Sequence, residues 1–334
     1  MKICICGGGN LGHVCAGFLA NRGHQVSILT TKPERWNTEL EIVAPDITFT
    51  GKLDLVTSKP EEVIPQAEMI LVCLPGFAIH EELVNIKPYL SKDSIVGSVV
   101  SSTGFFFEAF SVLPSDISLF GFQRVPFISR IIEYGKEAEL KGYKETLHVA
   151  IENTTEKEPI REKLKRLFEK PVTLADSYYE VSLSNSNPLL HPARLYTMWK
   201  DWQPGIIYPR NPQFYAEWTT EASTLLLRMD EEFQQLLKAL GLKHGCIPTI
   251  LDYYESTDTA SLTQKLHDIK AFQGILSPMK EADGGWIPDL SSRYFTEDFP
   301  YGMRFIVETA HEHDVEIPKI EDVYQWGQKV SKTF

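Results

Sequence analysis

Short apolar segments alternate with segments of helical periodicity along the first half of the chain. Runs rich in Ile, Val, Leu and Cys predict buried strands, and they cover residues 2–6, 25–30, 69–74 and 94–100, with further candidates at 119–125 and 147–152. Apolar residues recur at helical spacing over 13–22, where Gly23 ends the pattern, and residues 163–170 predict a surface helix. This alternation is typical of a doubly wound parallel sheet with helices on both faces.

The pattern changes near residue 175 and becomes mainly helical. A long amphipathic helix is expected from Pro209 to Gly241, because its apolar residues share one helical stripe: Phe214, Trp218, Ala222, Leu226, Met229, Phe233, Leu237 and Leu240. Helical periodicity returns at 259–272 and 301–313. We therefore expect an α/β domain over residues 1–175, followed by an all-α helical domain over residues 176–334.

Glycines stand between the first expected strand and the first expected helix. The segment Gly7-Gly8-Gly9-Asn10-Leu11-Gly12 has G-x-G-x-x-G spacing in the strand–turn–helix context that dinucleotide binding requires. Gly7 would permit the tight turn, Gly9 the close approach of a pyrophosphate, and Gly12 close packing of helix on strand. The helix N-terminus would face the phosphates with unpaired N–H groups. These features predict a Rossmann domain that binds NAD or NADP through Gly7, Gly9, Asn10, Leu11 and Gly12.

The ends of the next strands bear on cofactor preference. Ligands of open parallel sheets lie outside the carboxyl ends of the strands, so Leu74 and Pro75 are expected to contact the cofactor. NAD enzymes usually carry Asp or Glu about 20 residues past the glycines, whereas this chain has Thr30-Thr31-Lys32-Pro33-Glu34-Arg35. Thr30, Thr31, Lys32 and Arg35 would suit a 2′-phosphate, which favours NADP over NAD. The alternative is a solvated loop in which Glu34 binds the ribose.

Composition narrows the class of protein. The chain has 334 residues, a net charge of −12 and five cysteines. The acidic balance argues against nucleic acid and anionic membranes as partners. An odd number of cysteines, most of them within apolar segments, favours reduced core thiols over a disulfide framework. No signal-peptide pattern precedes the first strand and no apolar run reaches the roughly 20 residues that span a bilayer, so we expect a cytoplasmic protein.

Two segments of the second half combine residues that could carry chemistry. His191 follows the amide-rich run of residues 184–187 and lies between two prolines, and a histidine can take and give a proton near neutral pH. Residues 291–302 contain Arg293, whose planar fork suits a carboxylate, and Asp298, which could orient a histidine. From the residues alone, a buried structural histidine, an exposed ion pair and a helix cap remain alternatives.

Four segments together resemble the octopine/nopaline (opine) dehydrogenases. They occur in the order of that family over nearly the whole chain: residues 7–12, Gly121-Phe122-Gln123-Arg124-Val125-Pro126-Phe127, Asn187-Pro188-Leu189-Leu190-His191-Pro192, and residues 293–302 with the pattern Arg-x-x-x-x-Asp-x-Pro-Tyr-Gly. The last two motifs are the more specific. The resemblance implies a Rossmann domain followed by a helical domain. It also implies an NADH- or NADPH-dependent oxidoreductase, acting on CH–NH donors, that reductively joins an amino acid to a 2-oxo acid.

The resemblance also implies roles for individual residues. His191 matches the histidine that acts as general acid and base, and Asp298 would hold its imidazole in one tautomer. Arg293 would bind a substrate carboxylate, Gln123 would position the 2-oxo acid, and Asn187 would contact substrate, although Asn185 could fill that role equally well. No metal is required, because an iminium ion is itself a good electrophile. Small-molecule substrates are the expected partners, and formation of a homodimer is left open.

Two other functions stay in view. One is a reductase similar to ketopantoate reductases or glycerol-3-phosphate dehydrogenases, families that depend on a catalytic lysine in the helical domain. The other is a non-catalytic protein that senses NAD(P). The run His311-Glu312-His313-Asp314 superficially suggests a metal site, but histidines two positions apart face different sides of a helix. His13 could approach the cofactor phosphates or could be an ordinary helix residue.

Overall fold

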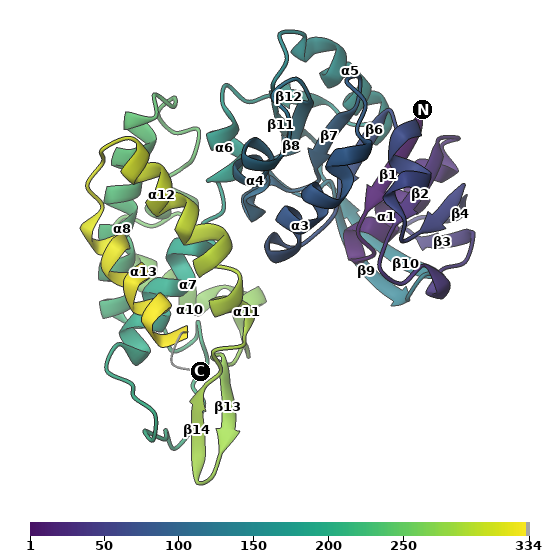
Figure 1. The fold of residues 1–334 in the computed structure, drawn as a ribbon. Helices are drawn as coiled ribbons and strands as arrows, with labels where there is room; N and C mark the ends of the chain where they lie inside the picture. Colours follow the sequence, from purple (N-terminus) through teal and green to yellow (C-terminus); the bar gives the residue numbers. More distant parts are fainter. Residues whose placement is uncertain (332–334) are drawn as a thin grey trace. The chain divides into compact units, whose positions relative to one another are not determined.

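The protein divides into two units, each with its own core. A computed structural model describes residues 1–331, and contacts between Cα atoms separate Met1–Ser184 from Asn185 onward. Figure 1 shows strands and helices in the first unit and mainly helices in the second. The expected fold, a Rossmann domain followed by a helical domain, is confirmed, while the functional boundary at 175/176 stays a prediction.

The first unit is built on an eight-stranded sheet. Its strands lie in the order β12 (Val172–Leu174), β11 (Leu147–Glu152), β8 (Ser118–Phe122), β7 (Ile95–Ser98), β6 (Met69–Val72), β1 (Lys2–Cys6), β2 (Gln25–Leu29) and β5 (Leu55–Thr57). The strands from β8 to β5 run parallel, whereas β11 pairs antiparallel with β8. The carboxyl ends of β1, β2, β6 and β7 therefore lie at the same end of the sheet, as the sequence predicts.

Alternating side chains of the central strands supply two separate cores. Ile3 and Ile5 of β1 pack in one core with α1 (Asn10–Asn21) and α5 (Lys157–Phe168). Cys4 and Cys6 pack in the other core, which also contains residues of α2 (Pro60–Val63), α3 (Gly76–Ile86), α4 (Phe105–Val112) and α6 (Tyr178–Ser182). Because successive side chains of a strand point to opposite faces, the apolar run covers both faces of the sheet.

A second sheet, which the sequence analysis missed, packs against α1. Its four strands are β4 (Thr48–Lys52), β3 (Glu39–Val43), β10 (Glu137–Tyr143) and β9 (Phe127–Glu133). The signal for the β9–β10 hairpin was present, because alternating apolar and polar residues flank a turn at Gly135, whose φ is +75°. Close packing is visible at Gly17 of α1, where a Cβ would lie 2.4 Å from the Ile42 side chain.

The second unit is a helical bundle with one β-hairpin. Its helices are α7 (Asn187–Trp199), α8 (Thr220–Ala239), α9 (Ile250–Tyr253), α10 (Thr259–Asp268), α11 (Arg293–Thr296), α12 (Arg304–Glu312) and α13 (Pro318–Ser331), with a π-helical turn, η6, over Phe299–Met303. The hairpin of β13 (Met279–Ala282) and β14 (Gly285–Pro288) departs from the all-helical expectation. Its residues alternate only over four positions, which is too short a signal to separate from a loop.

The helix expected from Pro209 begins eleven residues later, at Thr220. Thr219 is the N-cap of α8, and its side chain accepts a hydrogen bond from the backbone N–H of Ala222. A threonine with this bond fixes the start of a helix, so the prediction for residues 209–219 is wrong. Phe214 and Trp218 are nevertheless buried, since the preceding loop folds back against the bundle. Gly241 ends the helix as expected, with a φ of +71°.

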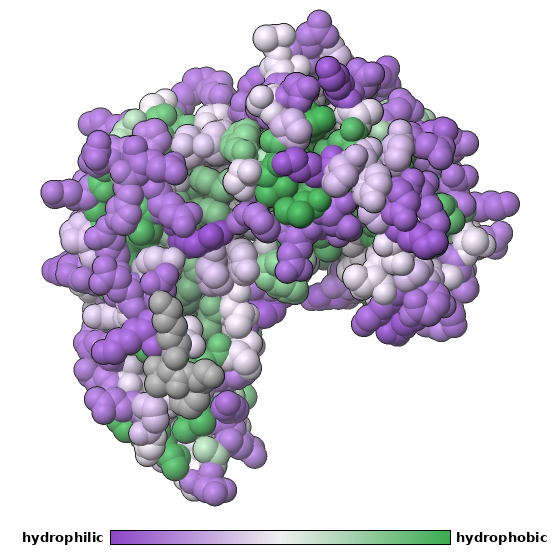
Figure 2. All heavy atoms as spheres, in the orientation of Figure 1, coloured by the Kyte–Doolittle hydropathy of each residue, from purple (hydrophilic) through white to green (hydrophobic). Residues whose placement is uncertain are grey.

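The surface agrees with the acidic, polar composition. On the face drawn in Figure 2, hydrophilic residues predominate and hydrophobic residues gather only in small patches. Among the described residues, none of the helices is both long and apolar enough to cross a bilayer. The five cysteines are all free thiols, and four of them are buried, in agreement with the core role expected for them.

Candidate functional site

The glycine turn after β1 has the geometry that its sequence predicts. Gly7 has a φ of +116°, a conformation that side chains rarely adopt, and a Cβ on Gly12 would lie only 2.0 Å from the Gly7 carbonyl oxygen. A Cβ on Gly9, by contrast, would meet no atom within 4 Å. Gly7 and Gly12 therefore serve close packing of strand and helix, while open space lies beside Gly9.

That open space adjoins the N-terminus of α1. Gly9 is the N-cap with an extended backbone, no side chain caps the helix, and no acidic residue lies in its first turn. The first N–H groups of a helix have no partner inside the helix, and they favour an anion. The residues present therefore fit the pyrophosphate of NAD or NADP.

The side chains of Asn10 and Leu11 each have a contact within the protein. Asn10 Oδ1 accepts a hydrogen bond from the Ile131 N–H at 2.8 Å, which secures strand β9. Leu11 packs against the core. Asn10 is exposed, whereas Leu11 is partly buried, and contact of either residue with a cofactor stays a prediction.

His13 has a structural role that the sequence did not reveal. It is fully buried, its Nδ1 lies 2.9 Å from the Gly9 carbonyl oxygen, and its Nε2 lies 2.8 Å from the Gly135 N–H nitrogen. The carbonyl can only accept and the N–H can only donate, so the ring carries its proton on Nδ1. Burial lowers the pKa of His13 to about 4, which keeps the ring neutral. His13 thus ties the glycine turn to the β9–β10 hairpin.

Two basic side chains, Lys32 and Arg35, are exposed in the segment that follows β2. Thr30 is buried, whereas Thr31, Lys32 and Arg35 are exposed. The Arg35 guanidinium lies 4.5 Å from the centre of the Tyr134 ring, on the β9–β10 hairpin. Stacking on this ring holds the arginine near the end of β2, where a ribose 2′-substituent would be expected.

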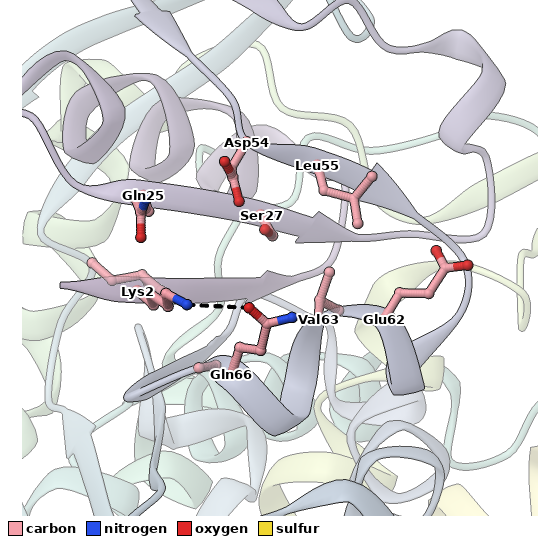
Figure 3. Close-up of a pocket in the computed structure, with 10 residues that line it drawn as sticks. Lys2, Gln25, Ser27, Asp54, Leu55, Glu62, Val63 and Gln66 are labelled. Carbon is pink, nitrogen blue, oxygen red and sulfur yellow. Dashed lines mark hydrogen bonds between the residues drawn. The ribbon is translucent and has the colours of Figure 1, made fainter.

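The remaining residues predicted for the first unit also lie at carboxyl ends of strands. Leu74 and Pro75 follow β6, where Pro75 is the N-cap of α3, and Gln123 directly follows β8. All three are partly buried. A pocket shown in Figure 3, lined by Lys2, Gln25 and Asp54 among others, lies instead at the amino ends of β1, β2 and β5. Parallel sheets do not bind ligands at that end, so we do not assign the cofactor to it.

The second unit brings together His191 and Asp298, which are 107 residues apart in the chain. His191 Nδ1 lies 2.7 Å from Asp298 Oδ2, and both side chains are largely buried. An ionised carboxylate only accepts hydrogen bonds, so the imidazole proton lies on Nδ1 and Nε2 is left as an acceptor. This is the pairing that orients a histidine for acid–base chemistry.

Local structure explains how the two motifs meet. Helix α7 carries His191, and the turn η6 follows Asp298, whose carbonyl oxygen accepts from the Met303 N–H five residues on, at 2.7 Å. A Cβ on Gly302 would lie 2.4 Å from the Pro188 ring. Gly302 therefore lets η6 press against the first turn of α7, which seats Asp298 beside His191.

Asn187 lies one helical turn before His191 on α7. Asn185 Oδ1 accepts a hydrogen bond from the Asn187 N–H at 3.2 Å, so Asn185 is engaged in forming the start of the helix. Residues four apart share a helix face, so Asn187 stands on the side of α7 that carries the imidazole. The geometry favours Asn187 over Asn185 as a candidate for substrate contact.

Arg293 lies near this site but is paired within its own helix. Its side chain is 82% exposed, and its Nε and Nη2 donate to the two carboxylate oxygens of Glu297 at 2.9 and 2.7 Å. These bonds use two of the five N–H groups of the guanidinium. The ion pair fixes the orientation of the guanidinium, and its other N–H groups stay available for a further hydrogen-bond acceptor.

Two tyrosines that the sequence pattern does not single out lie beside His191. Tyr215 Oη lies 2.8 Å from His191 Nε2, and the ring centre of Tyr294 lies 4.6 Å from that of the imidazole. Tyr215 belongs to the segment wrongly predicted as helix, and Tyr294 belongs to the motif that contains Arg293. No local pattern marks either residue, since only the folded bundle brings them to His191.

No metal centre is formed by the residues that the structure describes, because no three or more His, Cys, Asp or Glu side chains are grouped to hold an ion. His311 instead pairs with Glu321 through Nε2 at 2.5 Å. The run at 311–314 is thus the end of α12 with an exposed ion pair.

Comparisons with known proteins agree with this geometry. Residues 174–331 match the family model for the alpha-helical domain of NAD/NADP octopine/nopaline dehydrogenase, and residues 3–101 match that for ketopantoate reductase PanE/ApbA. The opine dehydrogenase of Haliotis discus hannai is 29% identical, and the alignment covers 98% of this chain and 90% of that protein. The octopine dehydrogenase of Pecten maximus is 27% identical over 100% of this chain and 91% of its own length.

Solved structures point the same way. A structure of octopine dehydrogenase with NADH and L-arginine superposes with a TM-score of 0.87 at 27% identity, covering 98% of this chain and 89% of that one. A structure of yersinopine dehydrogenase with NADP⁺, at 12% identity and a TM-score of 0.74, shares the fold. The chain therefore belongs to the octopine/nopaline (opine) dehydrogenase family of NAD- or NADP-dependent oxidoreductases that act on CH–NH donors.

Proposed function

We propose that this chain reductively condenses the amino group of an amino acid with the ketone of a 2-oxo acid, with pyruvate as the first candidate, and that it also catalyses the reverse reaction. The observation that carries this proposal is the buried His191–Asp298 pair. Relatives named octopine and tauropine dehydrogenase support the choice of substrates, as do structures of octopine dehydrogenase with L-arginine or with pyruvate.

His191 would act as the general acid and base. During condensation the amine must lose a proton and the carbinolamine hydroxyl must gain one, and an imidazole near neutrality can serve both steps. Asp298 would keep the proton on Nδ1 and stabilise the imidazolium that forms when Nε2 is protonated.

Three further residues would bind the substrates. Arg293, oriented by Glu297, would use its remaining N–H groups for a substrate carboxylate. Gln123, at the carboxyl end of β8, would position the 2-oxo acid, and Asn187 would contact substrate from the face of α7 that carries His191. In this scheme residues 1–175 form the cofactor domain and residues 176–334 form the catalytic domain.

The cofactor, when bound, supplies the hydride that reduces the imine carbon. The turn at Gly7, Gly9 and Gly12 would hold its pyrophosphate, with Leu74 and Pro75 beside it. We favour NADP over NAD, because Lys32 and the stacked Arg35 offer two cations to a 2′-phosphate. Replacing Arg35 by Ala should weaken NADPH binding about tenfold, the loss of one charge-assisted hydrogen bond, and leave NADH binding within about twofold. Titration by fluorescence measures both constants.

Oxidation of NADPH and NADH, followed by absorbance, tests the function directly. The protein should oxidise one of them only when a 2-oxo acid and an amino acid are present together, and pyruvate with a panel of amino acids is the first set. Oxidation with the oxo acid alone would identify a simple ketone reductase instead. Tight cofactor binding without turnover of any pair would contradict the proposal and favour a sensor of NAD(P).

A further inference from the structure

The acid–base nitrogen of His191 is covered by a tyrosine. Nδ1 is bound to Asp298, and the only other ring nitrogen, Nε2, lies 2.8 Å from Tyr215 Oη. Because Nε2 is the acceptor in the neutral ring, the Tyr215 hydroxyl donates to it. A proton that enters or leaves His191 at Nε2 therefore has to pass through this hydroxyl or wait until the tyrosine moves away.

The surroundings of Tyr215 hold the ring in place. Tyr215 is 5% exposed, and its ring stacks on Phe272, with centres 4.1 Å apart and planes 19° apart. Trp218 lies parallel to it at 6.2 Å, and Phe214 meets it edge-on at 5.0 Å. A swing of the ring would break both stacking contacts, so the hydroxyl is fixed against Nε2.

Hydrogen bonds also join the segment that contains Tyr215 to the helix that carries His191. Arg194, one turn after His191 on α7, is buried and donates through Nη2 to the Glu217 carbonyl oxygen at 2.5 Å and through Nη1 to Thr219 Oγ1 at 3.4 Å. One helix thus positions both the imidazole and the tyrosine. Two of the three nitrogens of this buried guanidinium have their partners in this loop segment, whereas no partner is found for Nε.

We propose that Tyr215 is a further catalytic residue, whose hydroxyl transfers protons between His191 Nε2 and the substrate. The proposal rests on the proposed function and deepens it. Asp298, His191 and Tyr215 would form one chain of hydrogen bonds, in which Tyr215 Oη rather than the imidazole meets the reacting amine and hydroxyl groups.

The proton balance of the dehydration step is complete. Protonated His191 gives its Nε2 proton to Tyr215 Oη while the Tyr215 proton moves to the hydroxyl of the carbinolamine. The C–O bond breaks, water leaves, and the nitrogen lone pair forms the C=N bond, so the positive charge passes from imidazolium to iminium. Burial raises the pKa of the Tyr215 hydroxyl far above its usual range, which disfavours a free tyrosinate and favours transfer of the two protons together.

Tyr215→Phe tests the proposal because it removes only the hydroxyl. We expect kcat to fall about 10²-fold or more, the range of general acid–base catalysis, while the dissociation constant of NAD(P)H and the thermal midpoint change little. Tyr208→Phe is the matched control: Tyr208 lies outside the His191 cluster and pairs with Trp286 through its backbone, so this variant should keep wild-type kcat. A kcat of Tyr215→Phe within about threefold of wild type would overturn the proposal.

A double-mutant cycle separates a proton chain from a packing defect. If Tyr215 acts only through His191, then His191→Gln combined with Tyr215→Phe should be no slower than His191→Gln alone, because the two residues act as a unit. Multiplicative losses in the double variant would show that Tyr215 acts independently of His191 and would overturn the chain.

The ¹⁵N resonances of His191 test the Tyr215–His191 hydrogen bond without any substrate, and therefore independently of the proposed function. In protein labelled with ¹⁵N-histidine, Tyr215→Phe should move the Nε2 resonance of neutral His191 and leave that of Nδ1 near its wild-type position. An unchanged Nε2 resonance would contradict the hydrogen bond itself, whatever substrates the enzyme uses. If no substrate pair is turned over and the resonance does move, the proposed function fails while the hydrogen bond stands.

Discussion

Each unit contains one buried histidine that lies one turn into a helix, His13 in α1 and His191 in α7. Both rings use both nitrogens in hydrogen bonds, but the partners differ in kind. His13 bonds to the backbone of Gly9 and Gly135, whereas His191 bonds to Asp298 and Tyr215, two side chains that can exchange or stabilise a proton. Burial alone therefore does not distinguish a structural histidine from one that exchanges protons. The nature of the two partners does.

The largest expected effect comes from His191. His191→Gln should lower kcat by about 10²–10⁴-fold, because it removes the group that exchanges protons with Tyr215 Oη, while NAD(P)H binding in the first unit should stay within about twofold. Steady-state kinetics and fluorescence titration measure the two quantities. Turnover of His191→Gln at the wild-type rate would mean that His191, like His13, has only a structural role.

The next effect is the acid sensitivity conferred by His13. Its pKa of about 4 in the fold lies below 6.5, the value for a free side chain, so between these values the unfolded chain binds more protons. The stability that the neutral ring contributes is therefore present above pH 6.5 and is lost as the pH falls toward 4, by roughly 3 kcal/mol in total. Urea unfolding at pH 7 and pH 5 measures part of this loss.

His13→Gln supplies the comparison, because glutamine can still accept from the Gly135 N–H but does not titrate. This variant should lose less stability than wild type between pH 7 and pH 5. His244, which is exposed, provides the control, and His244→Gln should keep the wild-type dependence. An equal pH dependence in His13→Gln and wild type would remove His13 as the source of acid sensitivity.

The smallest effects separate two glycines of one motif. Gly12→Ala would force a Cβ to within 2.0 Å of the Gly7 carbonyl oxygen, and overpacking of this kind costs about 1–3 kcal/mol. Gly9→Ala meets no atom within 4 Å and has an ordinary φ of −85°, so its thermal midpoint should stay near wild type. We expect Gly9→Ala to weaken NAD(P)H binding, because its methyl group would occupy the space beside the helix N-terminus.

Calorimetry and cofactor titration on both variants test this separation. Equal losses of stability in Gly9→Ala and Gly12→Ala would mean that the space beside Gly9 is filled in the folded protein. Unchanged binding by Gly9→Ala would place the pyrophosphate elsewhere.

The parts of the molecule that the sequence predicted are contiguous in the chain. The strand, turn and helix around Gly7–Gly12 follow one another directly, so local spacing was enough to predict their geometry, and strands of the parallel sheet were located to within two residues at most ends. The second sheet, formed by β3, β4, β9 and β10, was not predicted. Its strands come from two distant segments, residues 39–52 and 127–143, which pair only when the chain folds.

The helical unit shows where local patterns fail. The stripe from Phe214 to Leu240 has helical spacing throughout, but the Thr219 N-cap and the bonds of Arg194 hold residues 214–219 out of the helix. The spacing of apolar residues predicts which side chains are buried. It does not predict which segments are held outside a helix by hydrogen bonds to other parts of the fold. For the same reason no local pattern connected Tyr215, which lies between Phe214 and Trp218 of that stripe, with His191.

Local sequence was enough to predict a dinucleotide-type turn, a parallel sheet and a helical second half, because each depends on neighbours within a few residues. Local composition also made His191 and Asp298 candidates, and the family resemblance added their roles. Three features became clear only from the folded protein: His13 is structural, the contact of Gly302 with Pro188 brings Asp298 to His191, and Tyr215 covers Nε2. Such contacts join residues up to 122 positions apart, and their geometry depends on how helices and loops pack rather than on any local pattern.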